Sequence, residues 1–263
     1  MKFRKFIILT LLAGCFTACE SIDEDERFIG PVDFVPKKNV LIEDFTGQRC
    51  LNCPKAADAV HTLQQTYGAD HVISVAIHGG AMSLPNTSSM GLATPAGEEY
   101  NTRWGVDSWP KGLVDRQGGL LEFTSWSGYV IDRMQTNAKV EMGMGNNRYD
   151  AATRTASIQV DLNAVEDVNV KLQVWVVESG IVAYQIMPDG SHNTNYEHNH
   201  VFRDAVNGTW GEDISLKEGT SQTLQYTYEL KEAKWVAENM SVVAFVYNDA
   251  EGVLQVIDAP ILK

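Results

Sequence analysis

The chain has 263 residues, with 34 Asp and Glu against 21 Lys and Arg, and its formal net charge is −13. This excess of acidic residues argues against nucleic-acid binding, which requires a basic surface. The length exceeds that of a typical single domain and is sufficient for two.

The N-terminus has the features of a secretory signal. The basic residues Lys2, Arg4 and Lys5 precede an apolar run at 6–14, which is too short to span a bilayer as a stable helix. Removal of residues 1–18 as a signal peptide changes the formal net charge from −13 to −16, because three positive charges and no negative ones are lost.

Two cysteines in this segment each end a sequence that resembles the lipobox of bacterial lipoproteins, LAGC at 12–15 and FTAC at 16–19. In that class the cysteine becomes the acylated N-terminus, which makes the lipid bilayer a partner. We favour Cys19 over Cys15, because cleavage before Cys19 leaves no stray thiol. It also places an acidic run directly after the lipid, as in the surface-export signal of Bacteroidota lipoproteins. The alternative is an ordinary signal peptide with incidental cysteines.

After the signal peptide, three further regions differ in composition. Residues 19–36 form an acidic tether that contains Gly30 and Pro31. Residues 37–140 carry strand and helix signals, and residues 147–263 carry strand signals without helices. The predicted fold is therefore an α/β domain followed by an all-β antiparallel sandwich domain, with the boundary in the Gly-containing stretch near 144–147.

The α/β domain is predicted from alternating strand and helix patterns. Short apolar runs predict strands at 40–42, 72–77 and 112–115, and helical spacing predicts helices at 54–67, 97–104 and 126–138. Pro54 suits a first helical turn and Gly68 suits a helix end. The order of strand, helix and strand implies a sheet covered by helices.

The sandwich domain is predicted from β-rich runs separated by turn signals. The runs lie at 155–162, 170–177, 181–186, 223–230, 241–247 and 253–257. Many short strands without helices are typical of an antiparallel sandwich. Residues 187–221 are expected to form a long loop region.

After removal of the signal, Cys50 and Cys53 are the two cysteines of the folded protein. A cysteine at the start of a helix is stabilised as a thiolate, because unpaired N–H groups and the helix dipole favour negative charge there. Cys50 is expected just before the helix, exposed and beside Arg49, and Cys53 in its first turn. The pair has three possible roles: a redox catalyst, an inert structural disulfide, or part of a metal site.

Strand, C-x-x-C and helix together resemble thioredoxin-like proteins, and this resemblance covers about residues 36–138. It implies that Asp44 is a buried acid able to take a proton from the second cysteine, and that Pro110 is a cis proline facing the disulfide. It departs from thioredoxin itself at Leu51-Asn52, which replaces Gly-Pro, and at Arg49, which replaces Trp.

A wider resemblance is carried by IEDFTGQRCLNCP at 42–54, IHGG at 77–80, WPKGLVDR at 109–116, HNHVFRDAVNGTWGE at 198–212, and VVAFVYN at 242–248 with VLQ at 253–255. On these segments the chain resembles the outer membrane protein 28-related lipoproteins of Bacteroidota. The resemblance implies a thioredoxin-like domain, then a β domain, on a lipid-anchored outer-membrane protein with a periplasmic or cell-surface face.

Other residues have alternative interpretations. His78 ends a predicted strand and either tunes Cys50 or bonds to nearby backbone. His198 and His200 are weak candidates for metal ligands, because residues two apart on a strand share a face. Trp175, Trp210 and Trp235, with Tyr226 and Tyr228, either form a glycan platform or pack inside the sandwich. No nucleotide-binding motif is present, and no cofactor is expected.

The leading functional hypothesis is thiol–disulfide exchange on exported proteins, whose thiols or disulfides would be the partners. Cys50 would attack, Cys53 would resolve the mixed disulfide, and Asp44 and Pro110 would complete the catalytic set. The alternative is a non-enzymatic surface binding or adhesion lipoprotein, in which Cys50–Cys53 is a structural disulfide and the 187–221 region carries the interaction.

Overall fold

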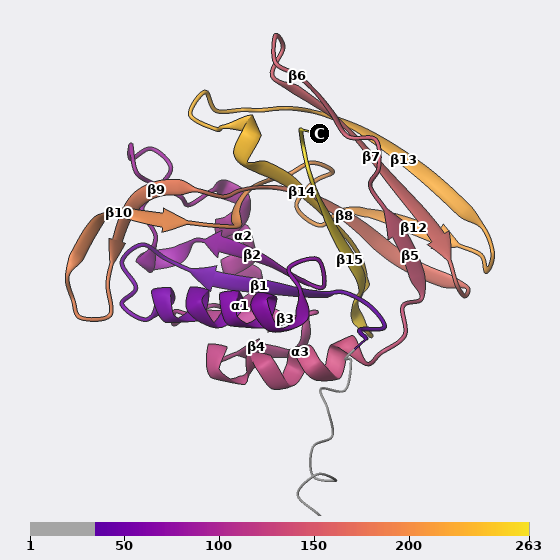
Figure 1. Ribbon diagram of the computed structural model, residues 1–263, viewed down its shortest axis with the longest axis horizontal. Coiled ribbons are helices and arrows are strands. Elements are labelled where there is room, and N and C mark those ends of the chain that lie inside the picture. Colours follow the sequence, from indigo (N-terminus) through magenta and orange to yellow (C-terminus); the bar gives the residue numbers. More distant parts are fainter. Residues whose placement is uncertain (1–34, 263) are drawn as a thin grey trace, which may run out of the picture. The chain divides into compact units, whose positions relative to one another are not determined.

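The computed structural model describes residues 35–262, and residues from Pro36 onward form one compact unit (Figure 1). The predicted signal peptide, both lipobox cysteines and nearly all of the tether lie outside the described residues. None of the helices within 35–262 has the length and apolar character needed to cross a bilayer.

The N-terminal part of this unit follows the predicted order of strands and helices. Its elements are β1 (Val40–Thr46), α1 (Cys53–Tyr67), β2 (Val72–His78), α2 (Pro95–Trp104), β3 (Lys111–Val114), β4 (Gln117–Leu121) and α3 (Trp126–Met134), with short 3-10 turns at Gly80–Met82 and Phe123–Ser125. Strand β1 pairs with β2 in parallel and with β3 antiparallel, and β3 pairs with β4. The parallel β1–β2 pair requires the crossover that α1 supplies.

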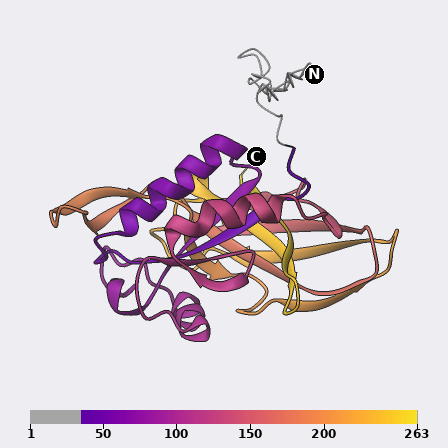
Figure 2. The ribbon, with the colours of Figure 1, turned by 90° about the horizontal axis from the view of Figure 1, so that it is seen from below.

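Local sequence explains where the helices begin and end. Pro54 occupies the first turn of α1, and Gly68 follows its last residue with a positive φ of 97°. The Thr94 side chain accepts a hydrogen bond from the Gly97 N–H and so caps α2. Helices α1 and α3 cover one face of the sheet and α2 covers the other (Figure 2).

The C-terminal part consists of strands, as predicted, and forms β-sandwich-like sheets. Its elements are β5 (Val140–Gly143), β6 (Arg148–Asp150), β7 (Thr155–Ala164), β8 (Val168–Glu178), β9 (Ile181–Ile186), β10 (His192–His198), β11 (Val201–Ala205), β12 (Glu212–Leu216), β13 (Ser221–Glu229), β14 (Met240–Asn248) and β15 (Gly252–Pro260), with a 3-10 turn at Ala237–Asn239. Strands β13, β7 and β5 form one sheet, to which β6 adds. An apolar core fills the space between this sheet and β8, β12, β14 and β15.

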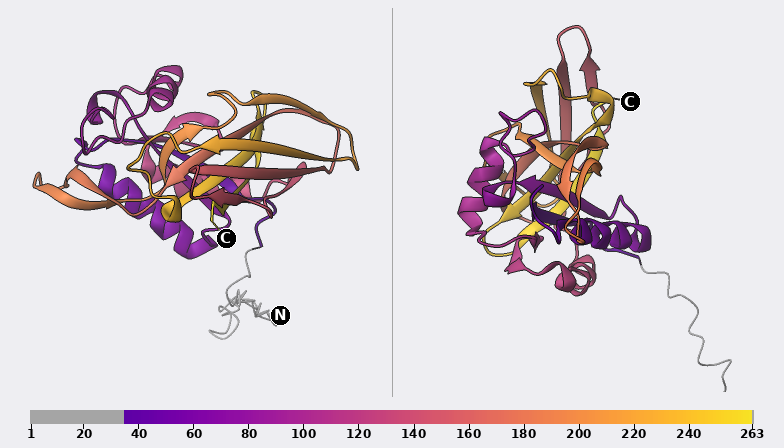
Figure 3. Two further views of the ribbon diagram at one scale, coloured as in Figure 1. Left: turned by 90° about the horizontal axis from the view of Figure 1, so that it is seen from above. Right: turned by 90° about the vertical axis from the view of Figure 1, so that its left-hand side faces the viewer.

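A single sheet runs through both predicted domains, in the order β15-β14-β8-β11-β2-β1-β3-β4. The connection is the parallel pairing of β11 with β2, at Val201 and Ala76. Strand β8 is buried on both faces: Leu172 and Val174 enter the sandwich core, whereas Trp175 packs with Phe45 of β1 in a second core. The segments on either side of the expected boundary near 144–147 thus contribute strands to one sheet (Figure 3) and side chains to one apolar core.

The region at 187–221 differs from its prediction as a loop, since it contains β10, β11 and β12. Strands β9 and β10 form a separate two-stranded hairpin, with His198 opposite Ile181 and His192 opposite Ile186. This β9–β10 hairpin extends beside the N-terminal end of α1, where the cysteine pair lies (Figures 1 and 3).

Candidate redox site

Cys50 and Cys53 form a disulfide with their Cα atoms 5.5 Å apart. Cys53 is the first residue of α1, and its backbone N–H donates to the Cys50 Sγ at 3.1 Å. The two cysteines are 4% and 3% exposed respectively. Cys50 is thus placed just before the helix as predicted, but the expectation that it is exposed is wrong for this disulfide form.

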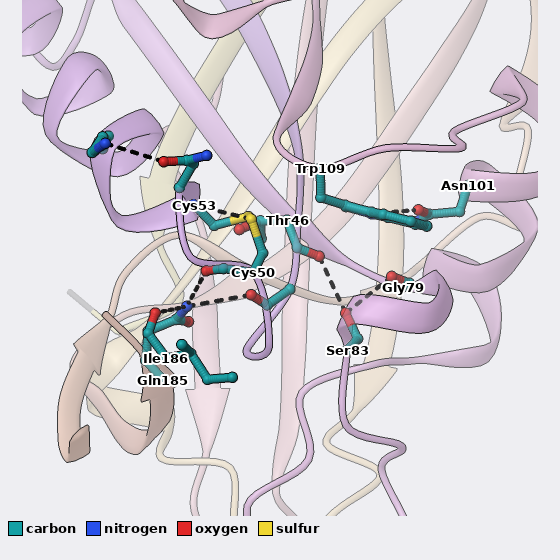
Figure 4. Close-up of a disulfide and its surroundings, with 12 residues drawn as sticks. Thr46, Cys50, Cys53, Gly79, Ser83, Asn101, Trp109, Gln185 and Ile186 are labelled. Atoms are coloured by element: carbon teal, nitrogen blue, oxygen red, sulfur yellow. Dashed lines mark hydrogen bonds between the residues drawn. A yellow bond between two sulfur atoms is a disulfide. The ribbon is translucent and has the colours of Figure 1, made fainter. Parts of the chain in front are cut away.

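The β9–β10 hairpin is bound to the loop that carries Cys50. The side-chain amide of Gln185 donates to the carbonyl oxygen of Cys50 at 2.9 Å and to that of Gly47 at 3.4 Å (Figure 4). The backbone N–H of Ile186 donates to the carbonyl oxygen of Gln48 at 2.9 Å. The loop that carries Cys50 is therefore bound to the hairpin through both backbone and side-chain hydrogen bonds.

Gln48 extends this network in the opposite direction. It is fully buried, and its side-chain amide donates to the carbonyl oxygens of Met90 and Tyr184, at 2.7 and 3.1 Å. Its side-chain oxygen accepts from the Leu92 N–H at 3.2 Å. Since Tyr184 belongs to β9, the hairpin, the Cys50 loop and the segment before α2 are fixed to one another.

Asp44 lies on β1 with a 4% exposed side chain, and its Oδ1 atom has no hydrogen-bond partner. Burial raises the pKa of Asp44 from 3.8 to about 8, because the charged carboxylate is poorly solvated there. Its parallel neighbour is Ala76, and Thr46 stands opposite His78. Asp44 and His78 therefore lie on the same face of the sheet, diagonally across two adjacent strands.

His78 and His198 are buried imidazoles with ring centroids 5.4 Å apart. The Nδ1 atom of His78 has no hydrogen-bond partner. Burial lowers the pKa of His78 well below its usual value, and His198 and Arg203 contribute in the same direction. Burial likewise lowers the pKa of His198 to about 4. Both imidazoles are consequently neutral at pH 7.

Cys53, the buried Asp44 and the two imidazoles all lie at one cavity of about 530 Å³. Cys53, and not Cys50, lines it from α1, and Asp44 and His78 line it from the sheet. Tyr196 and His198 of β10 form the opposite wall, and His200 also contributes. The cavity lies between α1, the sheet and the β9–β10 hairpin, so elements from both predicted domains build it.

The described residues contain no group of three or more potential ligands arranged to hold a metal ion, so the weak metal candidates His198 and His200 gain no further ligand. The two histidines also do not lie on one face of a single strand, as the prediction required. His198 ends β10, and His200 follows it with a positive φ of 56°. Both line the cavity, and burial lowers the pKa of each imidazole.

The Trp109–Pro110 peptide bond is cis, as predicted. Lys111 pairs with Phe45, which places Pro110 one position further along, beside Thr46 at the end of β1. Thr46 lines the cavity with Cys53. The four predicted residues Asp44, Cys50, Cys53 and Pro110 thus converge on one end of the sheet.

The tryptophans weighed as a glycan platform do not form one surface. Trp175 and Trp235 are buried in different cores, one in the core shared with β1 and the other in the sandwich. Trp210 instead lines a separate cavity of about 980 Å³ with Trp104 and Tyr247.

Gln185 was missed by reasoning from sequence, although one signal was present. Along β9 the buried positions are Ala183 and Gln185, so the strand pattern places a polar side chain on its buried side. A buried amide requires hydrogen-bond partners, and such a residue indicates a structured contact. The partner itself is 135 residues distant and leaves no local pattern.

Comparison with solved structures shows what the fold of this chain is similar to. The structure of HBP35 of Porphyromonas gingivalis matches with a TM-score of 0.66 at 17% identity, covering 86% of this chain and 76% of that one. The sporulation control protein Spo0M of Bacillus subtilis matches with a TM-score of 0.30 at 12% identity, over 48% of each chain. A β-glucosidase of Kluyveromyces marxianus reaches 0.27 at 13% identity, over 48% of this chain and 14% of that one. The last two TM-scores are too low to indicate a shared overall fold.

Among curated proteins, none matches the chain. The sequence model of the family described as outer membrane protein Omp28 matches residues 97–262, from α2 to the end of the described chain. This range excludes the cysteine pair and includes the WPKGLVDR and HNHVFRDAVNGTWGE segments. It supports an outer-membrane or cell-surface location. The chain belongs to the Omp28 family of outer membrane proteins.

Proposed function

We propose that the protein is a thiol–disulfide exchange protein of the cell envelope, with a thioredoxin-like N-terminal part. The order β1, α1, β2, α2, β3, β4, α3, with β1 between β2 and β3, supports this interpretation. The cis Pro110 before β3 and the cysteine at the start of α1 support it as well.

One observation carries the proposal: Cys53 and the buried Asp44 line the same cavity. A thiol must lose its proton to attack a disulfide, and a thiolate released from a disulfide must regain one. A carboxyl group whose burial raises its pKa to about 8 exchanges protons near neutral pH. The N-terminus of α1 favours the thiolate form of the cysteines beside it.

We assign the reactive pair as in thioredoxin-like proteins, with Cys50 as the attacking thiol of the reduced form and Cys53 as the resolving thiol. Exported proteins are the partners proposed from sequence. The protein reaches them as a lipoprotein acylated at Cys19, with Cys15 as the alternative site. The acidic tether at 19–36 would then join the anchor to the folded unit at the outer membrane.

A redox titration of the native protein tests this function. In buffers of oxidised and reduced dithiothreitol, the disulfide should equilibrate while the circular dichroism spectrum stays that of the folded protein. Alkylation followed by mass spectrometry gives the reduced fraction. A disulfide that becomes reducible only where the protein unfolds would overturn the proposal.

The second candidate function is a surface binding protein with a structural disulfide. The burial of both cysteines and the hydrogen bond from Gln185 to Cys50 favour it, because they protect the bond. The same titration separates the two functions. A structural disulfide closing so short a loop should contribute at the low end of the usual range of about 0–5 kcal/mol to stability and should exchange slowly.

A further inference from the structure

We infer that the cavity beside Cys53 is a binding site for a small thiol that is neutral or positively charged, and that this thiol reduces the disulfide by attack at Cys53. The inference rests on the proposed exchange function and names the substrate class of the same site. The cavity lined by Asp44, Cys53, His78 and Tyr196 is the site.

Access is the first argument. A thiol attacks a disulfide at one sulfur, in line with the bond that breaks. The two cysteines are about equally buried, but Cys53 lines the cavity and Cys50 does not. The loop that carries Cys50 is held against the β9–β10 hairpin by Gln185. A volume of about 530 Å³ accommodates a small molecule. An extended protein segment would first have to displace the hairpin from the Cys50 loop.

The cavity also has polar groups without partners, which is the second argument. Asp44 Oδ1 and His78 Nδ1 are buried and have no hydrogen-bond partner in the described structure. Buried polar atoms are nearly always satisfied, because an unmade hydrogen bond costs about 1–3 kcal/mol. A ligand carrying a hydroxyl, amine or thiol can supply hydrogen bonds to these two atoms.

Charge selects the kind of thiol. Among the described residues that line the cavity there is no Lys or Arg. Asp58 and Glu197 are exposed acidic residues of the lining and give it a formal negative charge. Burial lowers the pKa of His78, His198 and His200, so these three imidazoles do not offset that charge. His61 is the fourth histidine of the lining, and it is exposed. A thiol bearing a carboxylate is repelled, whereas one bearing an ammonium group is attracted.

The reaction balances with the thiol as the reductant. The thiol transfers its proton to the Asp44 carboxylate, and its sulfur attacks Cys53 Sγ. A mixed disulfide forms at Cys53, the Cys50–Cys53 bond breaks, and Cys50 leaves as a thiolate beside the N-terminus of α1, which favours negative charge. This thiolate then takes up a proton from water, and Asp44 returns its proton to water. A second thiol molecule then attacks the mixed disulfide, which releases the small disulfide and the Cys53 thiol. Two thiols are oxidised and one protein disulfide is reduced.

The test uses three small thiols of similar size and different charge. Cysteamine is positive, 2-mercaptoethanol is neutral and 3-mercaptopropionate is negative. Second-order rate constants for reduction of the native protein are compared per thiolate, at low and at high salt. Cysteamine should exceed 3-mercaptopropionate by about tenfold at low salt, and salt should reduce this ratio because it screens exposed charges.

Variants locate the effect. The double variant Asp58→Asn with Glu197→Gln should bring the ratio of the cysteamine and 3-mercaptopropionate rate constants close to that of an uncharged peptide disulfide. Glu229→Gln, an exposed control on β13, should leave this ratio unchanged. Ala57 is an exposed lining residue of α1, so Ala57→Phe should narrow the cavity and slow all three thiols about tenfold or more. The single variants Cys50→Ser and Cys53→Ser are each treated with cystamine and analysed by mass spectrometry. The mixed disulfide should form on Cys53, in the Cys50→Ser variant.

The outcomes separate the inference from the function on which it rests. Reduction without charge preference, without an effect of Ala57→Phe, or faster by reduced thioredoxin than by cysteamine would overturn the small-thiol site and leave the exchange function standing. If no thiol reduces the folded protein, the exchange function itself fails.

Discussion

Gln185 and Cys50 are 135 residues apart in the sequence, and the side-chain amide of one donates to the carbonyl oxygen of the other at 2.9 Å. This hydrogen bond joins a hairpin of the C-terminal half to the redox loop of the N-terminal half. It makes the accessibility of the disulfide depend on residues that carry no redox chemistry.

Gln185→Ala should therefore speed reduction of the disulfide and lower stability. The variant loses the hydrogen bonds to Cys50 and Gly47, and unfolding free energy should fall by about 1–3 kcal/mol because buried carbonyl oxygens lose their partner. Reduction by dithiothreitol, followed by alkylation, measures the first effect, and urea unfolding measures the second. Gln222→Ala, at an exposed position of β13, is the matched control. Equal reduction rates in the two variants would show that the hairpin does not limit access.

Asp44→Asn should change the pH dependence of stability. Burial raises the pKa of Asp44 from 3.8 to about 8, so the folded state holds this proton more tightly than the unfolded state. Its contribution to stability is complete below about pH 4 and is lost as the pH rises to about 8. At about 1.4 kcal/mol per pKa unit, the loss is at most of the order of 5 kcal/mol.

The asparagine variant lacks this titration, so its stability relative to wild type should improve between pH 5 and pH 9. Guanidinium unfolding with the disulfide intact, at both pH values, gives the comparison. The pKa values of His78 and His198 are also lowered by burial. Their contribution to the free energy of unfolding is common to the variant and the wild type, so subtracting one free energy from the other removes it. A difference that stays constant with pH would contradict the raised pKa.

Arg116→Met should be one of the most destabilising single substitutions. The Arg116 guanidinium donates to both carboxylate oxygens of Glu43, at 2.8 and 2.9 Å, and both side chains are buried. Removing the cation leaves a buried carboxylate without its partner, which should cost about 3–5 kcal/mol. Urea unfolding followed by circular dichroism measures the loss.

The double substitution Glu43→Leu with Arg116→Met should be less destabilising than Arg116→Met alone, because no unpaired charge remains. Arg148→Met, at an exposed position of β6, should have little effect. If the double variant were as unstable as the sum of the two single variants, the pair would not be coupled in the way proposed.

A fragment of residues 36–140 should not fold by itself. Strand β2 would lose its neighbour β11, and Leu41 and Phe45 would lose their contacts with Trp175 and Phe202. Exposure of such an apolar surface should produce an aggregating or disordered chain. Dispersion in an amide NMR spectrum is the measurement, with residues 36–263 as the control. A well-dispersed spectrum for the fragment would restore the two-domain division predicted from sequence.

Acylation is predicted at Cys19. Mass spectrometry of the membrane fraction should find a lipidated N-terminal cysteine, and Cys19→Ala should abolish it, whereas Cys15→Ala should not. The reverse pattern would move the site to Cys15. The absence of lipid from the wild-type protein would remove the anchor from the proposed function.

The elements with strong local patterns were predictable from the sequence. The helix at 54–67 has both its proline start and its glycine end, and β7, β8, β13 and β14 are long β-rich runs. Strand β10 was missed because HNTNYEH contains almost no apolar residue, and its pairing with β9 depends on backbone hydrogen bonds. Strand β4 was missed because QGGLL contains two adjacent glycines, which are poor strand formers, after the polar turn at Asp115 and Arg116.

The candidate site divides in the same way. Cys50 and Cys53 follow from their spacing before a helix, whereas Asp44 and Pro110 follow from the resemblance to thioredoxin-like proteins. The walls of the cavity do not, because Tyr196, His198 and Gln185 reach it through the β9–β10 hairpin. Likewise, no local pattern reveals that β8 is buried on both faces and so joins the two predicted domains.

The position of the β9–β10 hairpin in the chain has a consequence for biosynthesis. A polypeptide is made from its N-terminus, so Cys50 and Cys53 exist before Gln185 is added. During that interval the pair can meet an oxidant directly, without the cover that the finished protein provides. Once β9 and β10 dock, Gln185 binds the loop that carries Cys50. The contact between the hairpin and the cysteine loop therefore forms only after most of the chain has been made.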